Sequence, residues 1–325
     1  MTKTDILQYL RKSGGFVSGE EISRHFGVSR TAVWKVITAL REDGYVIDSV
    51  TKKGYHLAEA PDLLSEAEIR EGLHTTRIGT HIFSFDTVDS TNEEAKRQGQ
   101  AGAPDGSVFV AEQQTGGKGR LGRVWSSPRG KGIWFTILLR PGGSPLQVSN
   151  ITLLAGLAVC SAIRKTTGCP AMIKWPNDVI IGSKKVCGIL TEISAEMDCI
   201  HYLVIGIGIN ANNESFPEEL SVKAISLQIE TGTSISRVKL LQAVLQEFET
   251  LYSRFPTAKE PEFLDLYRAV CASLNRRVST VRQGKTITGK AINITPDGEL
   301  LIELDTGENL AVNAGEVTVQ GIYGQ

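Results

Sequence analysis

The sequence predicts an α+β protein of several domains, and three observations support that fold class. With 325 residues, the chain is too long for one hydrophobic core and suits two or three domains. The central part mixes helical and strand-like periodicities, whereas the last part is rich in short alternating strands. These changes of pattern divide the chain into domains at 1–60, 62–270 and 275–325.

The first domain, 1–60, has the pattern of a winged helix-turn-helix. Ser18-Gly19-Glu20-Glu21 is a capping box that begins a helix, and Gly27-Val28-Ser29 is a tight turn whose serine caps a second helix. Apolar residues at helical spacing predict that the two helices pack together. Strand-like stretches on either side of Lys52-Lys53-Gly54 predict a hairpin with a basic tip, which would be the wing.

The second helix and the hairpin tip are the candidate DNA-binding surface. The residues expected to contact DNA are Arg30, Thr31, Trp34, Lys35, Lys52 and Lys53. Lysine and arginine suit phosphate contacts, while Arg30, Thr31 and Lys35 are the residues expected to reach base edges. The alternative is a small packing module with solvated cations, but the turn, the helix cations and the basic wing occur together and favour DNA binding. Such a motif usually acts in pairs, so another part of the chain must dimerise.

The second domain, 62–270, is predicted to be a mixed, mostly antiparallel sheet backed by helices. Ser65 begins a short helix by a capping box, and apolar residues keep helical spacing from Ile151 to Gly168. We expect an amphipathic helix at 238–252 and strands at 82–85, 133–139, 171–175, 179–181, 186–193 and 202–209. The later connections are too short for parallel crossovers, so these strands should be antiparallel neighbours.

The third domain, 275–325, is predicted to be a small SH3-like β-barrel. Its short alternating strands are separated by Pro296-Asp297-Gly298 and Asp305-Thr306-Gly307. Proline, aspartate and glycine clusters of this kind form turns, and closely spaced strands of this length are typical of small barrels.

Composition limits the classes of protein to which the chain can belong. A hydrophobic fraction of 41% and a formal charge of −1 describe a globular protein, so contact with nucleic acid requires a local basic patch. The five cysteines are scattered without C-x-x-C spacing, which argues against a zinc cluster and indicates reduced thiols in the cytoplasm. No apolar stretch is long enough to cross a bilayer and the N-terminus lacks a signal core, so we expect no membrane partner.

Residues 116–125, GGKGRLGRVW, contain a candidate nucleotide-binding loop. The loop satisfies G-x-G-x-x-G, but a turn and a strand follow it where a Rossmann fold needs a helix, so that interpretation fails. A Walker A interpretation also fails, because Gly-Lys-Ser or Gly-Lys-Thr is missing at the required position. What remains is a loop between strands that carries Lys118, Arg120 and Arg123, either as a solvated basic loop or as an anion-binding loop.

Four stretches of the second domain place polar residues and glycines at expected strand ends, where scaffolds usually display a site. They are Ser90-Thr91-Asn92, the glycine-rich loop with Gln114 before it, Lys174-Trp175-Pro176-Asn177-Asp178 with Lys184-Lys185, and Gly206-Ile207-Gly208-Ile209-Asn210. Each also has a purely structural interpretation, as a helix cap, a solvated loop, a turn or a close-packing site. The five histidines lie outside these stretches, so we expect no histidine general base there. The cations, amides and carboxylate of the four stretches instead suit phosphate chemistry driven by positioning and charge neutralisation.

Taken together, these motifs resemble those of the bacterial biotin protein ligases. Gly117 to Arg123 is similar to the family's Gly-Arg-Gly-Arg-x-Gly-Arg motif, and Lys174–Asp178, Gly188-Ile189-Leu190 with Glu192, and Gly206–Asn210 follow in the family's order. The outer domains resemble those of the bifunctional members, which also repress biotin operons. The resemblance covers nearly the whole chain and implies a class II synthetase-like ligase domain at its centre.

The resemblance implies an ATP-dependent ligase with two half-reactions. The biotin carboxylate would attack the α-phosphorus of Mg²⁺-bound ATP and give biotinyl-5′-adenylate and pyrophosphate. A lysine of a biotin carboxyl carrier protein, from acetyl-CoA carboxylase or pyruvate carboxylase, would then accept biotin and release AMP. Both nucleophiles belong to substrates, in agreement with the absence of a catalytic-triad motif. The adenylate-bound chain is expected to form a homodimer that places two winged helices on operator DNA.

The roles of the family fall on residues of the four stretches. The expected catalytic residues are Lys185, Arg120 and Lys118. The expected biotin-binding residues are Ser90, Thr91, Asn92, Gln114, Lys118, Gly119, Arg120 and Lys185. The expected nucleotide-binding residues are Arg120, Arg123, Asn177 and Asn210, with Asp178 as the candidate Mg²⁺ ligand. The glycine-rich loop is expected to order over the adenylate as a clamp that excludes water.

The chain departs from the family pattern at Lys118, where an arginine is usual, and at Leu121, a position that can be basic in relatives. Lysine lacks the planar fork of arginine, so binding there would depend more on backbone amides. Two other functions stay open at this point. One is a lipoate or octanoate ligase with the same fold, and the other is a transcription factor whose central domain binds an effector without turnover.

Overall fold

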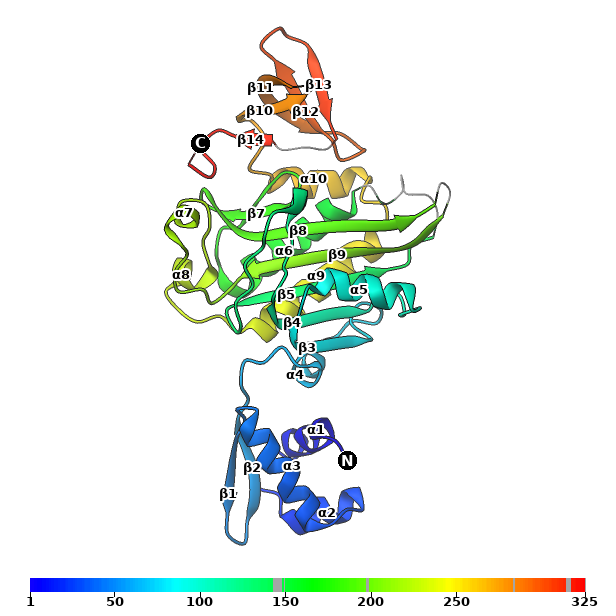
Figure 1. Cartoon of the computed structure of the whole chain (residues 1–325), viewed down its shortest axis with the longest axis vertical. Coiled ribbons are helices and arrows are strands. Elements are labelled where there is room, and N and C mark those ends of the chain that lie inside the picture. Colours follow the sequence, from blue (N-terminus) through cyan, green and yellow to red (C-terminus); the bar gives the residue numbers. More distant parts are fainter. Residues whose placement is uncertain (143–147, 149, 197–198, 283, 314–316, 325) are drawn as a thin grey trace. The chain divides into compact units, whose positions relative to one another are not determined.

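We describe the protein from a computed structural model of the chain (Figure 1). The structure describes residues 1–142, 148, 150–196, 199–282, 284–313 and 317–324. It divides into two compact units, Met1–Leu63 and Leu64–Gln325, which are treated separately below. The predicted fold class is confirmed, with helices and a hairpin first, a mixed sheet next and a small antiparallel β domain last. The boundary expected between 270 and 275 stays a prediction.

The first unit is a helix-turn-helix followed by a β-hairpin. Its elements are α1 (Lys3–Ser13), α2 (Gly19–Phe26), α3 (Arg30–Glu42), β1 (Val46–Val50) and β2 (Gly54–Glu59). The hydroxyl oxygen of Ser18 accepts a hydrogen bond from the backbone of Glu21 at 3.1 Å, and that of Ser29 accepts one from Ala32 at 3.2 Å. Both serines therefore cap the helices that the sequence predicts.

Helix α1 was not among the predicted elements. Thr2 and Asp5 form a reciprocal capping box at its start, and Gly14 ends it in a left-handed conformation. Its Ile6 and Leu7 side chains are buried in the core of the unit. The helix thus completes a three-helix core beneath the wing.

The second unit is built on a seven-stranded sheet in the order β3-β4-β5-β9-β8-β7-β6. The strands are β3 (Ile82–Val88), β4 (Val108–Gln114), β5 (Gly132–Leu139), β6 (Met172–Lys174), β7 (Asp178–Ile181), β8 (Lys184–Ala195) and β9 (Ile200–Asn210). Strands β3 and β4 are parallel, and every other pair of neighbours is antiparallel. This order confirms the mixed, mostly antiparallel sheet.

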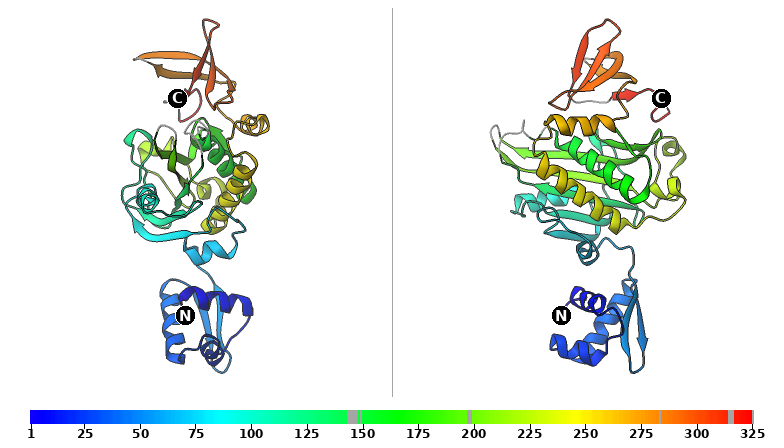
Figure 2. Two further views of the ribbon diagram at one scale, coloured as in Figure 1. Left: turned by 90° about the vertical axis from the view of Figure 1, so that its right-hand side faces the viewer. Right: turned by 180° about the vertical axis from the view of Figure 1, so that it is seen from behind.

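Helices cover both faces of this sheet. The helices of this unit are α4 (Glu66–Glu71), α5 (Thr91–Gln100), α6 (Ile151–Thr167), α7 (Glu218–Ser221), α8 (Leu227–Thr231), α9 (Arg237–Arg254) and α10 (Pro261–Ala269). Figure 2 shows α6 and α9 side by side across one face, while α5 lies on the other. All eight residues of β5 are buried, as expected for a central strand covered on both faces.

A five-stranded antiparallel sheet follows, in the order β13-β12-β11-β10-β14. Its strands are β10 (Arg277–Arg282), β11 (Lys285–Ile294), β12 (Leu300–Leu304), β13 (Asn309–Val312) and β14 (Val317–Val319). The Trp175 indole donates a hydrogen bond to the carbonyl of Gly298 at 2.9 Å, and the Trp175 backbone donates one to the Ser273 hydroxyl at 3.0 Å. These bonds fix the small sheet against the β6–β7 connection of the larger one.

The five cysteines are all free thiols, and four of them are buried. Burial raises the pKa of both Cys160 and Cys271 to about 11, so these two thiols are poor nucleophiles at neutral pH. In the part of the chain that the structure describes, every helix is too short or too polar to cross a membrane.

Candidate functional site

A pocket that is partly open to solvent lies above the middle strands of the large sheet. The start of α5, the end of β4, the glycine-rich loop and the strands β8 and β9 contribute its walls and floor. The pocket is lined by Ser90, Thr91, Asn92, Gln114, Lys118, Gly119, Arg120, Trp125, Asn177, Lys185, Gly188, Ile189, Leu190, Gly206, Ile207 and Gly208. The four stretches singled out in the sequence therefore meet at one place, although the lining residues run from Ser90 to Gly208 along the chain.

Two glycines of β9 form the floor of the pocket. A Cβ atom on Gly206 would lie 2.1 Å from the side-chain oxygen of Asn92, and one on Gly208 would lie 2.5 Å from the indole nitrogen of Trp125. Both distances are far inside van der Waals contact, so only glycine leaves room for the side chains above. The close-packing interpretation of this stretch is correct, and the close packing shapes the pocket.

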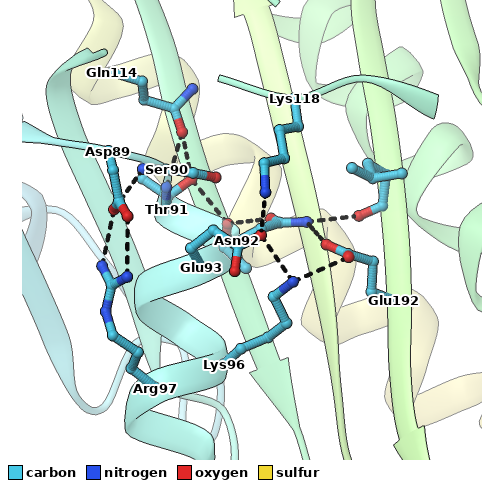
Figure 3. Close-up of polar contacts among 12 residues, drawn as sticks. Asp89, Ser90, Thr91, Asn92, Glu93, Lys96, Arg97, Gln114, Lys118 and Glu192 are labelled. Carbon is cyan, nitrogen blue, oxygen red and sulfur yellow. Dashed lines mark hydrogen bonds and ion pairs between the residues drawn. The ribbon is translucent and has the colours of Figure 1, made fainter. Parts of the chain in front are cut away.

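The wall formed by the start of α5 is a set of hydrogen-bonded polar groups (Figure 3). The Thr91 backbone and hydroxyl donate hydrogen bonds to the Gln114 side-chain oxygen at 2.8 and 3.1 Å, and the Gln114 amide donates to the Ser127 hydroxyl at 2.8 Å. Ser90 is buried, and its hydroxyl forms no capping hydrogen bond with α5. The interpretation of Ser90 as a helix cap is therefore wrong for its side chain, which lines the pocket instead.

A row of alternating charges runs beside this wall (Figure 3). The Lys118 amine lies 2.7 Å from a carboxylate oxygen of Glu93, which also lies 2.9 Å from the Lys96 amine. Lys96 in turn lies 3.1 Å from Glu192, whose second oxygen accepts a hydrogen bond from Asn92 at 2.9 Å. Lys118 and then Lys96 hold the pKa of Glu93 below its ordinary value. The row joins the glycine-rich loop to α5 and β8.

Two more cations, Arg120 and Lys185, line the pocket. Arg120 donates a hydrogen bond to the side-chain oxygen of Asn177 at 2.8 Å, and the Asn177 amide donates to the carbonyl of Ile189 at 3.0 Å. The Lys185 amine lies 2.6 Å from a carboxylate oxygen of Asp178 and 5.1 Å from the centre of a Trp125 ring. All three expected catalytic cations, Lys118, Arg120 and Lys185, thus line one pocket.

The residues around Asp178 do not fit a magnesium site. One of its oxygens faces the Lys185 amine, and the other accepts a hydrogen bond from the Tyr323 hydroxyl at 2.7 Å. Among the described residues, no three carboxylates, histidines or cysteines gather in a way that could hold a metal ion. Since Mg²⁺ prefers a set of oxygen ligands, this carboxylate is better matched to its cation and phenol partners.

Two of the expected nucleotide-binding residues lie outside the pocket lining. The Asn210 side chain is buried and donates a hydrogen bond to the carbonyl of Ile225 at 3.3 Å. Arg123 is exposed on the loop, where its carbonyl accepts a hydrogen bond from the Gly119 backbone at 2.7 Å. Their roles stay predictions.

Three residues near the pocket received no role from the sequence. Trp125 closes the glycine-rich loop and lies over the β9 floor, and an aromatic residue directly after a basic loop was a usable signal. Glu93 directly follows the Ser90-Thr91-Asn92 stretch and contacts Lys118. Tyr323 lies 145 residues from its partner Asp178, and local sequence offers no signal for that contact.

The residues of the first unit that are expected to contact DNA are all exposed to solvent. All of Arg30, Thr31, Trp34, Lys35, Lys52 and Lys53 are exposed, and the Trp34 side chain is 55% exposed. Arg41, near the end of α3, donates hydrogen bonds to the carbonyl of Ile47 at 3.0 Å and to the Ser49 hydroxyl at 2.5 Å. These bonds tie the wing to the helix that would enter the groove, so the two move together.

Comparison with known proteins covers all three parts of the chain. Residues 2–56 match an HTH domain, residues 84–210 match the Biotin/lipoate A/B protein ligase family, and residues 273–319 match the biotin protein ligase C-terminal domain. A solved structure of biotin protein ligase from Aquifex aeolicus, in complex with biotin and ATP, matches with a TM-score of 0.63 and 32% identity. The match covers 74% of this chain and 99% of that one.

Two curated relatives show the same similarity along the sequence. The biotin–[acetyl-CoA-carboxylase] ligase of Mycobacterium tuberculosis is 31% identical over 235 residues, which are 70% of this chain and 85% of that protein. The bifunctional ligase/repressor BirA of Bacillus spizizenii is 40% identical over 308 residues, which are 94% of this chain and 95% of that protein. The chain therefore belongs to the biotin protein ligase family and is an enzyme of that class with the helix-turn-helix domain of its ligase/repressor members.

Proposed function

We propose that the chain makes biotinyl-5′-AMP from biotin and ATP and then transfers biotin to a lysine of a biotin carboxyl carrier protein. The observation that carries this proposal is the convergence of Lys118, Arg120 and Lys185 on a pocket that also has a wall of amides and hydroxyls. The relative from Mycobacterium tuberculosis supports acetyl-CoA carboxylase as the source of the carrier. Pyruvate carboxylase would be a second source.

The polar wall suits the ureido ring of biotin. A cyclic urea offers one carbonyl acceptor and two N–H donors, so it needs a donor and acceptors at fixed positions. Ser90, Thr91, Asn92 and Gln114 provide hydroxyls and amides. Thr91 and Gln114 are hydrogen-bonded to each other, and the Asn92 amide is held by the Thr136 hydroxyl and the Leu190 carbonyl. Such preorganisation lowers the entropy lost when the ligand binds.

The cations suit the reacting end of biotin and ATP. A carboxylate and a triphosphate repel each other, and lysines and arginines placed where their charges meet relieve that repulsion. A biotin carboxylate oxygen would bond to the α-phosphorus while the bond from that phosphorus to the bridging oxygen breaks and pyrophosphate leaves. Lys118, Gly119, Arg120 and Lys185 would hold the carboxylate and the α-phosphate during this step.

The nucleotide would extend from Arg120 towards Asn177, which are hydrogen-bonded to each other. Arg123 and Asn210 would contact it from just outside the described pocket lining. Mg²⁺ would enter bound to the phosphates of ATP and supply charge neutralisation there, and we assign it no protein ligand. Ordering of residues 116–125 over the adenylate would exclude water from the anhydride.

In the second half-reaction, the amine of the carrier lysine would attack the acyl carbon of the adenylate. The bond from that carbon to the phosphate oxygen would break, AMP would leave, and the amine would lose a proton. The cations that hold the α-phosphate in the first step would then stabilise the departing AMP. The same residues therefore suit both half-reactions.

The first unit would give the same chain a repressor role in the cytoplasm. The proposed DNA contacts are Arg30, Thr31, Trp34, Lys35, Lys52 and Lys53, all exposed in the structure. Adenylate binding would favour a homodimer and thereby pair two winged helices on a palindromic operator.

The deciding experiment is exchange of labelled pyrophosphate into ATP, with biotin, lipoate and octanoate compared as acids. Exchange with biotin alone is the expected result. Exchange with lipoate or octanoate instead would assign the pocket to another acid. If no acid supports exchange while biotin still changes the affinity for operator DNA, the chain is a biotin-sensing repressor without ligase activity. Equal operator affinity with and without biotin and ATP would remove the regulatory part of the proposal.

A further inference from the structure

The last residues of the chain return to the hairpin that carries Lys185. The Tyr323 backbone donates a hydrogen bond to the carbonyl of Ser183 at 2.9 Å, in the turn between β7 and β8. Its hydroxyl donates to one carboxylate oxygen of Asp178, the first residue of β7, at 2.7 Å. The other oxygen of the same carboxylate lies 2.6 Å from the Lys185 amine. Tyr323, Asp178 and Lys185 thus form a continuous chain of contacts that ends in the pocket.

The surroundings of Tyr323 keep it a neutral donor. Its ring lies beneath the Lys174 amine, which is 5.1 Å from the ring centre. Burial, followed by the charge of Asp178, raises the pKa of the phenol far above its ordinary value. The other titratable groups of this cluster are Lys185 and the buried thiol of Cys187 on β8. The tyrosine hydroxyl therefore stays protonated throughout the neutral range and offers its hydrogen to Asp178.

Tyr323 and Lys185 contact different oxygens of the Asp178 carboxylate, and together they fix its orientation. A carboxylate group rotates about its last side-chain bond unless contacts on both oxygens hold it. The bond from Tyr323 fixes one oxygen, and the other then points at the Lys185 amine. Asp178 is only 9% exposed, so water cannot readily replace the tyrosine. Losing the hydroxyl would leave a buried carboxylate oxygen without its donor.

We propose that Tyr323 is a positioning residue for adenylate formation, which holds the Lys185 amine in place through Asp178. This inference rests on the proposed function, because it gives Lys185 the task of meeting the carboxylate and the α-phosphate. It also gives the end of the chain a part in the chemistry of a pocket that lies in the large sheet. Tyr323 acts only through Asp178 and does not itself touch the substrates.

The test is Tyr323→Phe in the full-length chain, measured by biotin-dependent pyrophosphate exchange. The variant keeps the ring under Lys174 and removes only the hydroxyl. We expect kcat to fall about 10- to 100-fold, the range for small displacements of a catalytic group, while the KM for biotin stays within about twofold. The matched control is Tyr252→Phe, a tyrosine on α9 beside Arg77 and outside the pocket, which should exchange at the wild-type rate.

A double-mutant cycle with Asp178→Asn separates positioning from a general structural role. If Tyr323 acts through Asp178, adding Tyr323→Phe to Asp178→Asn changes kcat by less than about twofold. Tyr323→Ala should lower the thermal midpoint more than Tyr323→Phe but lower kcat to a similar degree, because both lack the hydroxyl. A wild-type kcat in Tyr323→Phe, or an equal loss in both backgrounds, would overturn the proposal. Absence of exchange in the wild-type chain would instead defeat the proposed function itself.

Discussion

The cations of the two units differ in whether they contact a carboxylate. In Met1–Leu63, all of which the structure describes, Arg30, Lys35 and Lys52 are exposed and make no ion pair. In the pocket of the second unit, Lys118 and Lys185 each contact a carboxylate of the protein. The difference teaches how two kinds of phosphate chemistry use the same residue types. DNA binding gains affinity by releasing counterions from a polyanion, whereas catalysis needs cations held in one geometry.

The largest expected effect is the loss of activity when a pocket cation that contacts a carboxylate is removed. We expect Lys185→Met to lower biotin-dependent pyrophosphate exchange by about 10²- to 10³-fold, as for loss of a group that stabilises developing charge. Lys184→Met removes the adjacent lysine, which does not line the pocket, and serves as the control. Equal rates for Lys185→Met and the wild type would show that the Asp178–Lys185 pair is only structural.

Removing an exposed cation should affect DNA binding without affecting catalysis. Arg30→Ala should weaken binding to a duplex selected from a random pool by about 1–3 kcal/mol if Arg30 contacts a base. Lys52→Ala should weaken all duplexes alike and reduce the slope of log affinity against log salt by about 0.9. Fluorescence anisotropy at several salt concentrations measures both. Lys12→Ala, which removes an exposed cation at the end of α1, should leave both quantities unchanged.

Removing the carboxylate partner of a pocket cation should leave that cation without an ion pair, like the cations of the DNA-binding face. In Glu93→Gln, Lys118 loses its carboxylate partner and becomes more available to an anionic ligand. Because the Lys118 side chain is 56% exposed, we expect only about a two- to fivefold lower Kd for biotin, and a smaller effect at high salt. Calorimetric titration measures this change. A higher Kd would mean that Glu93 holds Lys118 in its binding position.

The smallest effect concerns the carboxylate at the entrance to α5. The Arg97 guanidinium, with help from the Ser90 backbone, lowers the pKa of Asp89 to about 2. Asp89 therefore favours the folded state above its unfolded pKa of about 3.8, and this contribution is lost as pH falls towards 2. We expect Arg97→Gln to return the pKa towards 3.8 in an NMR titration. If the pKa stays near 2, the Ser90 backbone is the main cause.

Sequence reasoning found the elements of the fold because their signals are local. Ser18 and Ser29 cap the helices that their neighbours predict, and the short turn at Gly182-Ser183 joins antiparallel strands. It also found the cations of the pocket, since glycine-rich and basic motifs are local as well. Helix α1 was not predicted, although the Thr2–Asp5 capping box at its start is a local signal for it.

The residues that contact those cations could not be predicted from the local sequence. Lys118 contacts a carboxylate 25 residues away, and Asp178 contacts a phenol 145 residues away. Ser90 followed the pattern of a helix cap, but its side chain lines the pocket instead of capping α5. In each case the tertiary fold decides which of several compatible partners a polar side chain meets.

The glycine floor sets where this enzyme can change its substrate. Any mutation at Gly206 or Gly208 drives a Cβ atom into Asn92 or Trp125, so these two floor positions are closed to gradual variation. A preference for a different carboxylic acid can therefore arise only through substitutions of residues in the pocket walls. A directed-evolution library should therefore randomise positions such as Ser90, Gln114 and Leu190 and leave the two floor positions unchanged.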